Sequence, residues 1–384
     1  MKFVLAPDSF KGTLSSVEAA NLLQKAAAAH FPGAAFCKVP IADGGEGTVQ
    51  AVIVALDGDY RSAWVTGPLG EPVQAGYGFV KEGRLAVIEM AAASGLPLVP
   101  AALRNPLRTT SRGTGELLAR VLDEGAAEIL IGIGGSATND GGMGLLAALG
   151  ARFFDSAGAP LPGCGESLGR VARIDLTGLH PGLKRTPLTV ICDVTNPLLG
   201  PDGAAAVYAP QKGADAAAVA FLEEGMAHYA ALFRQQCGLD IANFPGAGAA
   251  GGLGAALGGV LGAGMRPGID AMLDLVGFDE LIDGADLVVT GEGRIDGQSV
   301  RYGKVVAGIA RRCAKTGVPL AIITGGMGPE AEMIFDVAFS SIMPSVSAAM
   351  PLEEALSRSH ELFESAADRM FRFIKIGYGM GGGR

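Results

Sequence analysis

Short apolar runs recur along the chain, and each ends near a Gly, Asp or Pro. Runs of this length without polar alternation are typical of parallel strands that are buried on both faces. The clearest runs cover residues 3–6, 85–89, 129–132, 188–192, 287–290 and 320–324. Helical patterns separate many of them, at residues 16–30, 115–124, 144–149, 216–237, 305–315 and 352–374. Strands that alternate with helices predict an α/β fold.

A different pattern between residues 60 and 84 indicates a second domain. Two alternating stretches, residues 61–66 and 73–79, flank a Gly-Pro-Leu-Gly turn, and together they predict a β meander. We therefore expect one domain from residues 1–60 and 285–376, interrupted by an inserted domain at residues 61–284. The glycine-rich residues 377–384 are expected to form a flexible tail.

The composition excludes several classes of protein. A net charge of −9 and the lack of a dense Lys/Arg cluster argue against a nucleic-acid surface. The five cysteines are dispersed without a C-x-x-C pair, which favours reduced thiols over a disulfide framework or a zinc site. No run of eighteen apolar residues and no signal peptide is visible. We expect a cytoplasmic protein with neither nucleic-acid nor membrane partners.

Glycine is over-represented: 59 of 384 residues, roughly twice the usual share of about 7%. The densest cluster, GIGGSATNDGGMG (132–144), has three interpretations. Gly132 to Ala137 fits a dinucleotide fingerprint with Asp155 as the ribose ligand, but Asn and Gly weaken the required helix. An anion cradle and a tight turn use glycine equally well, so both stay open. A Walker A loop ending at Lys304 has the wrong glycine spacing and lacks its Ser/Thr.

Acidic residues end the predicted strands or occupy the turns after them, where ligands of α/β sheets bind. For a single Asp, helix capping is the stronger interpretation, but the repetition indicates a shared site. The four histidines lie outside the glycine motifs, which argues against a catalytic triad. Carboxylates, glycine loops and loop cations together favour phosphoryl transfer with Mg²⁺. The loop cations are Lys11, Arg104, Arg108, Lys212, Arg294 and Lys304.

Ten motifs, in order along residues 6–299, resemble the bacterial glycerate kinase family, in its glycerate 2-kinase branch. They are APDSFKGTLS (6–15), ADGGEGT (42–48), VTGPLGEPV (65–73), VIEMAAASGL (87–96), RNPLRTTSRGTGEL (104–117), GIGGSATNDGG (132–142), CDVTNPLLG (192–200), APQKGAD (209–215), PGAGAAGGLG (245–254) and TGEGRIDGQS (290–299). The resemblance implies ATP-dependent phosphorylation of D-glycerate, with 2-phosphoglycerate favoured over 3-phosphoglycerate. It also implies a Rossmann-like three-layer α/β/α domain, an inserted α/β domain with a mixed sheet, and a cleft between them.

On this resemblance, Asp43, Asp193 and Asp296 are candidates for the general base or a Mg²⁺ ligand. Asp193 is the first choice for the base, and Asp193 and Asp296 are the predicted metal ligands. Lys11 and Arg294 are expected to hold the substrate carboxylate or the transferring phosphoryl group. The expected substrate and phosphate contacts are Asp8, Ser9, Glu46, Gly134, Gly135, Ser136, Asn139, Asp140, Asn196, Lys212, Glu292 and Lys304.

Three matters stay open at this point. The family usually places two residues between a Ser/Thr and Gly-Lys, whereas here three separate Ser299 from Gly303-Lys304, which puts the position of Lys304 in doubt. A homodimer is also left open. The alternatives to a kinase are an NAD(P)-dependent dehydrogenase of a small hydroxy acid, using Gly132 to Asp155, and a non-catalytic ligand sensor.

Overall fold

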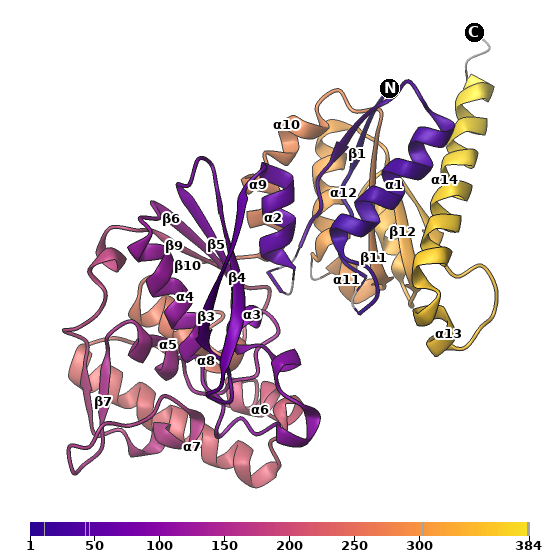
Figure 1. Ribbon diagram of the computed structural model, residues 1–384. Coiled ribbons are helices and arrows are strands. Elements are labelled where there is room, and N and C mark those ends of the chain that lie inside the picture. Colours follow the sequence, from indigo (N-terminus) through magenta and orange to yellow (C-terminus); the bar gives the residue numbers. More distant parts are fainter. Residues whose placement is uncertain (11, 43, 46, 302, 382–384) are drawn as a thin grey trace. The chain divides into compact units, whose positions relative to one another are not determined.

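The chain forms two compact units, each with its own sheet and hydrophobic core. The computed structural model describes all residues except 11, 43, 46, 302 and 382–384 (Figure 1). Unit 1 consists of Met1–Asp43, Gln50–Asp57 and Ile269–Arg384, and unit 2 of Gly44–Val49 and Gly58–Gly268. Within the described part of the chain, no helix has both the length and the apolar character needed to cross a bilayer.

The sheet of unit 1 is parallel, with strand order β13-β12-β11-β1-β2. Its strands are β1 (Lys2–Leu5), β2 (Ala35–Lys38), β11 (Leu287–Ile295), β12 (Leu320–Met327) and β13 (Ser340–Pro344). The neighbours Val288 and Val289 are both 0% exposed. Because adjacent residues of a strand point to opposite faces, this sheet is covered on both sides.

Helices cover both faces of this sheet and produce three layers. On one face, α1 (Ser16–His30) and α14 (Ser359–Gly381) pack together against Phe3, Leu5 and Val289 (Figure 1). On the other face, α9 (Gly268–Leu275), α10 (Phe278–Ile282) and α12 (Val305–Thr316) pack against Val4 and Val288. The α/β class is confirmed, and unit 1 has the expected α/β/α layers.

The sheet of unit 2 is mixed, as expected for the inserted domain, with order β10-β9-β6-β5-β4-β3. The strands are β3 (Asp59–Thr66), β4 (Pro72–Val80), β5 (Leu85–Glu89), β6 (Glu128–Gly132), β9 (Leu188–Ile191) and β10 (Gly264–Arg266). The β3–β4 and β4–β5 pairs are antiparallel, and the rest are parallel. The predicted meander is therefore the antiparallel end of a sheet whose other strands are parallel.

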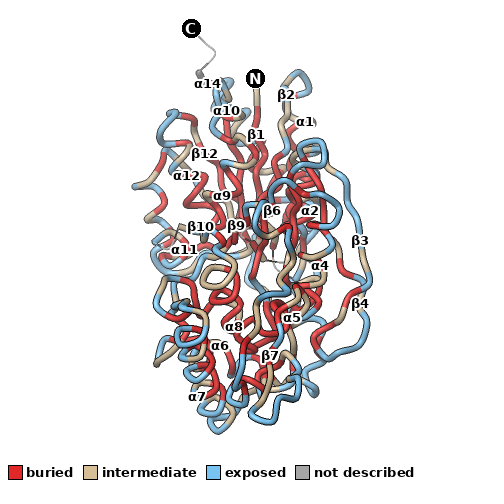
Figure 2. The backbone as a smooth tube through the Cα atoms, turned by 90° about the vertical axis from the view of Figure 1, so that its left-hand side faces the viewer, coloured by how far each residue is buried: buried red, intermediate tan, exposed pale blue. Residues whose placement is uncertain are grey.

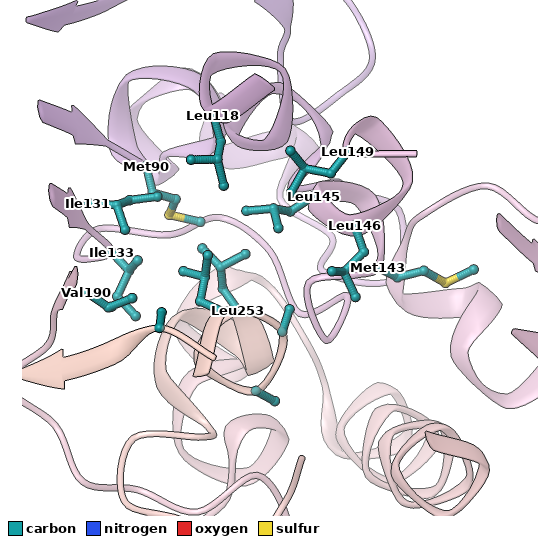
Figure 3. Close-up of a cluster of buried hydrophobic side chains, with 14 of the residues drawn as sticks. Met90, Leu118, Ile131, Ile133, Met143, Leu145, Leu146, Leu149, Val190 and Leu253 are labelled. Atoms are coloured by element: carbon teal, nitrogen blue, oxygen red, sulfur yellow. The ribbon is translucent and has the colours of Figure 1, made fainter. Parts of the chain in front are cut away.

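Helices from distant parts of the sequence fill the core of unit 2. Figure 3 shows Leu118, Leu145 and Leu253 converging beside Ile131 of β6 and Met90, which follows β5. In the tube of Figure 2, the buried residues concentrate in the interior, whereas most of β3 is exposed. The helices of this unit are α3 (Ala91–Ser94), α4 (Arg112–Asp123), α5 (Met143–Ala148), α6 (Ala204–Tyr208), α7 (Ala216–Leu232) and α8 (Ala249–Gly254); β7 (Arg152–Phe154) and β8 (Arg173–Asp175) form a separate pair.

Two details differ from the sequence-based boundaries. The return to unit 1 occurs at Ile269 and not at residue 285, because Ile269, Leu273 and Phe278 are buried in the core of unit 1. The limits of the two domains, as distinct from these compact units, stay a prediction. The expected flexible tail at 377–384 is helical as far as Gly381. This end of α14 is not free of contacts, since the ring of Tyr378 lies 6.5 Å from that of Phe31.

Candidate functional site

A pocket of about 480 Å³ opens at the carboxyl edge of the parallel sheet in unit 1. Strand-end residues line it: Asp8 after β1, Glu292 and Arg294 in β11, Gly325 and Gly326 in β12, and Ser345 after β13. Lys304 and Val305, at the start of α12, complete this side. The volume lies within the range of small-molecule sites.

The topology of the sheet explains why the pocket forms here. From β1 the chain passes through α1 to β2 on one side, and from β11 through α12 to β12 on the other side. The strand order therefore reverses between β1 and β11, and α1 and α12 cover opposite faces of the sheet. Such a switch point leaves a crevice at the carboxyl edge.

Register places two carboxylates at this switch point. Leu5 pairs with Val289, and Asp8 and Glu292 each follow three residues later. The Asp8 backbone N–H donates to the Gly291 carbonyl at 2.8 Å, which continues the pairing. Asp8 and Glu292 are 6% and 8% exposed. Two mostly buried acids therefore line one pocket.

Positive charge lies on the same pocket. The Arg294 and Lys304 side chains are exposed, and Arg294 Nε is 3.8 Å from Asp296 Oδ2. Asp296 itself starts the short helix α11 (Gly297–Arg301): its Oδ1 accepts the Ser299 backbone N–H at 2.9 Å. This bond lowers the pKa of the Asp296 carboxyl. The capping role considered for acids at strand ends thus applies to Asp296.

Apolar side chains form the remaining wall. Phe10 and Phe363 meet edge to face with ring centroids 5.0 Å apart. Leu352 and Leu356 come from α13 (Leu352–Ser357) and line the same pocket. The pocket therefore has a charged region at the strand ends and an apolar region at α13 and α14.

The glycine cluster after β6 in unit 2 serves close packing. A Cβ on Gly132 would lie 2.3 Å from the Gly44 carbonyl oxygen, and one on Gly134 would lie 3.0 Å from Gly45 Cα. Gly135 has φ +76°, in the region that favours glycine. Close backbone approach accounts for Gly132 and turn geometry for Gly135, while Gly134 and Gly135 are exposed, so the anion cradle stays a prediction.

The polar residues of the same cluster are buried and bound to the protein's own groups. Lys212 Nζ donates to Ser136 Oγ and to the Thr138 carbonyl, both at 2.7 Å. Asn139 Nδ2 donates to the Ala204 carbonyl at 2.9 Å. Ser136, Asn139 and Lys212 are 8%, 0% and 1% exposed. Desolvation lowers the pKa of Lys212 to about 7.

Asp140 is fully buried and ties this cluster to α4. Its Oδ2 accepts the Ser111 hydroxyl and backbone N–H, both at 2.8 Å, and the Gly144 N–H at 3.2 Å. Its Oδ1 accepts the Gly142 N–H at 3.0 Å. Burial raises the pKa of this carboxyl, while the four donors oppose that rise. With 0% of its surface exposed, Asp140 organises the loop and does not present a carboxylate to solvent. Its predicted phosphate contact stays a prediction.

Two other predicted residues follow β9. Asp193 is exposed, and its Oδ1 accepts the Gly268 N–H at 2.6 Å. Asn196 donates to the Asp202 carbonyl at 2.8 Å and accepts the Tyr208 hydroxyl at 2.6 Å. Asn196 thus fixes its own loop, whereas Asp193 remains accessible.

Apart from Asp193 and Asp296, described above, the predicted site residues separate into three groups. Asp8, Ser9, Glu292, Arg294 and Lys304 line one pocket. In unit 2, internal hydrogen bonds hold the side chains of Ser136, Asn139, Asp140, Asn196 and Lys212, and Gly134 and Gly135 are exposed; the ligand contacts of these seven residues stay predictions. Lys11, Asp43 and Glu46 lie outside the described residues.

Sequence reasoning missed several pocket residues. Gly325 and Gly326 follow directly after the predicted strand at 320–324, so their position at a strand end could have identified them. Nothing in the local sequence marks Leu356 or Phe363, because only the packing of α13 and α14 brings them to the pocket. Among the described residues, no group of three or more His, Cys, Asp or Glu side chains is arranged to hold a metal ion.

Comparison with known proteins gives the same result at the levels of family, sequence and structure. The profile of the glycerate kinase family matches residues 3–375. This chain belongs to the glycerate kinase family. The glycerate kinase of Bacillus subtilis strain 168 is 46% identical over 376 residues, covering 98% of each chain. The glycerate 2-kinase of Escherichia coli K12 is 45% identical over 98% of this chain and 99% of its own.

A solved structure supports the fold of this glycerate kinase family member. A crystal structure from Salmonella typhimurium LT2, provisionally assigned as glycerate kinase 2, matches with a TM-score of 0.85 at 43% identity, covering 99% of both chains. The prediction of an ATP-dependent glycerate kinase is confirmed by these relatives. The matches give no support to the dehydrogenase interpretation of the glycine cluster.

Proposed function

We propose that the protein transfers the γ-phosphoryl group of ATP to the 2-hydroxyl of D-glycerate, and that the pocket of unit 1 binds the phosphates. Family membership supports the reaction, and the name of the E. coli relative supports the 2-position. One observation carries the assignment of the pocket: two acids, Asp8 and Glu292, and two cations, Arg294 and Lys304, line it together.

In the proposed reaction, the 2-hydroxyl oxygen forms a bond to the γ-phosphorus. The bond from that phosphorus to the β,γ-bridging oxygen breaks, and its electron pair leaves with ADP. The hydroxyl proton passes to a carboxylate. Such transfer depends mostly on positioning and charge neutralisation. Lys304 and Arg294 supply positive charge for the phosphates, and the first turn of α12 adds its backbone N–H groups.

The acidic part of the pocket suits Mg²⁺, which usually binds one or two carboxylates together with phosphate oxygens. Asp8 and Glu292 would hold it, since both are mostly buried and line the pocket. The bound ion would neutralise charge on the phosphates. Asp296, chosen from the sequence as a metal ligand, already binds Ser299 through Oδ1, so its metal role stays a prediction.

Asp193 is retained as the proposed proton acceptor, because it is an exposed carboxylate directly after a buried strand. Replacement by Asn removes the proton-accepting oxygen and should lower kcat by roughly 10²–10⁴-fold. Asp202→Asn is the matched control, since Asp202 is also exposed in unit 2. A kcat near that of the wild type in Asp193→Asn would remove Asp193 from the mechanism.

A coupled assay of ADP release with ATP and D-glycerate tests the reaction. Turnover should disappear in excess EDTA and return with added MgCl₂, and phosphorus NMR should identify 2-phosphoglycerate. Failure to release ADP with D-glycerate would overturn the proposal, and 3-phosphoglycerate as product would correct its regiochemistry. A cytoplasmic location and a homodimer stay predictions, the latter to be tested by light scattering.

A further inference from the structure

We propose that the apolar wall of the unit 1 pocket, formed by Phe10, Leu352, Leu356 and Phe363, binds the adenine base of ATP. This inference rests on the proposed function, because it assigns the nucleoside end of the same substrate. These apolar side chains line the same pocket as the charged side chains of Arg294 and Lys304.

The separation of charged and apolar side chains matches the chemistry of a nucleotide. The triphosphate is anionic and needs cations and N–H groups, which the strand ends and α12 provide. A purine base is flat and gains from apolar and aromatic surface. Glycerate is a small polar acid and gains little from such a wall, so its chemistry does not account for these side chains.

The exposure of the wall also favours a ligand. Leu352 and Leu356 are 74% and 49% exposed, although they line a pocket. Phe363, by contrast, is 1% exposed and already packed against Phe10. Apolar surface left open beside a polar pocket is stabilised when a ligand covers it. The exposed leucines of α13 would then be covered by the adenine, whereas the buried phenylalanines form the fixed part of the wall.

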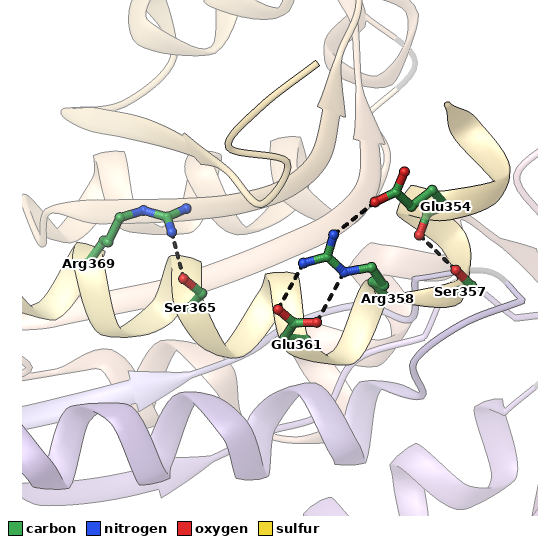
Figure 4. A network of polar contacts seen from close by, with 6 residues as sticks. All are labelled: Glu354, Ser357, Arg358, Glu361, Ser365 and Arg369. Carbon is green, nitrogen blue, oxygen red and sulfur yellow. Dashed lines mark hydrogen bonds and ion pairs between the residues drawn. The ribbon is translucent and has the colours of Figure 1, made fainter. Parts of the chain in front are cut away.

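Ion pairs hold α13 against α14 at this position. Figure 4 shows Arg358, between the two helices, bonded to Glu354 of α13 and to Glu361 of α14. Arg358 donates to Glu354 at 2.9 Å and to both carboxylate oxygens of Glu361, at 2.9 and 3.1 Å. The Ser357 hydroxyl donates to the Glu354 carbonyl at 2.9 Å in the same turn. This connection fixes the angle at which α13 presents Leu352 and Leu356.

Leu356→Asn tests the proposal by making the wall polar without changing side-chain volume greatly. We expect the KM for ATP, and the dissociation constant of ATP by calorimetry, to rise roughly ten-fold, because part of a leucine's burial is lost. The KM for D-glycerate should stay unchanged. Leu103→Asn is the matched control, since Leu103 is 56% exposed, belongs to unit 2 and is not among the residues that line this pocket.

Inorganic tripolyphosphate, which lacks a base, separates the two ends of the site. Its inhibition constant should be the same in Leu356→Asn and in the wild type. A rise in that constant, a rise in the KM for D-glycerate, or unchanged binding of ATP would each overturn the inference.

The outcome also distinguishes this inference from the proposed function. ATP binding that weakens in Leu356→Asn, in a protein that does not turn over D-glycerate, would support the base site and overturn the kinase proposal. Turnover of D-glycerate with ATP binding unaffected by the substitution would support the kinase proposal and overturn the base site.

Discussion

The strand ends of the two units use similar residues in opposite ways. In unit 1, Asp8 and Glu292 follow parallel strands and line a pocket beside exposed cations. In unit 2, Asp140 belongs to the cluster after β6 and Lys212 binds that cluster from a distant segment, yet both are at most 1% exposed and bind internal groups. A motif of glycine and acid after a strand can therefore build either a ligand site or an internal scaffold.

The difference lies in what covers the strand end. The sheet of unit 1 reverses its order between β1 and β11, which leaves space at the carboxyl edge. In unit 2, the Gly44–Gly45 backbone lies directly against Gly132 and Gly134, and groups of the same unit bind Asn139 and Lys212. Chain topology, and not motif content, decides the use of each cluster.

The largest expected effect is on catalysis in unit 1. Glu292→Gln removes a carboxylate from the pocket and should lower kcat/KM by roughly 10²–10⁴-fold, the range for a catalytic acid–base or charge-positioning group. The coupled ADP assay measures it. Glu332→Gln, at an exposed position of the same unit, is the control and should retain activity. Normal kinetics in Glu292→Gln would mean that the pocket is not the phosphate site.

The next effect tests the close packing in unit 2. Gly132→Ala places a methyl group 2.3 Å from the Gly44 carbonyl oxygen and should lower the free energy of unfolding by about 1–3 kcal/mol. Gly264→Ala has no atom within 4 Å of the added carbon and serves as the control. Urea unfolding measures both. Equal stability of the two variants would contradict the scaffold interpretation of the glycine cluster.

Buried Lys212 predicts a pH dependence of stability. Its folded pKa of about 7 lies below the ordinary 10.5, so between these values the unfolded chain binds more protons than the folded one. Stability should therefore rise with pH across this window, by up to about 1.4 kcal/mol per pH unit. Lys212→Met should lack this rise in urea unfolding at pH 7.5 and pH 9. A wild type whose pH dependence matches that of the variant would show that Lys212 does not titrate in this range.

The smallest effect concerns an exposed ion pair in unit 1. Arg358→Gln breaks the contacts with Glu354 and Glu361, but all three side chains are largely solvated. Surface pairs of this kind contribute little, so the unfolding midpoint in urea should hardly move. A loss of stability comparable to that of Gly132→Ala would show that this exposed ion-pair network contributes as much to stability as the close packing after β6.

Much of the fold followed from patterns in the sequence. Continuous apolar runs predicted the buried parallel strands β1, β11 and β12, and alternation predicted the antiparallel pair β3–β4. The unit boundary at Ile269 was missed because α9 and α10 carry no local sign of which core they join. The helical end of α14 was missed because its glycines suggest disorder, whereas Tyr378 contacts Phe31.

The site was predicted less completely. Asp8 and Glu292 were identified from their positions at strand ends, and Arg294 and Lys304 as loop cations; all four line one pocket. Asn139 and Asp140 were identified by the same rule and are buried. A rule based on strand ends finds the polar residues of an edge, but it does not tell a residue that faces a ligand from one that faces the protein.

By itself, the sequence determined the class of fold, the family and the residue types of the chemistry, because periodicity and motifs are local properties of the chain. Only the tertiary structure decided which strand ends are open. That depends on the order of strands and on which distant backbone segment lies against each loop, as Gly44 lies against Gly132. Solvent access is a property of packing among segments far apart in the chain, and no local pattern encodes it.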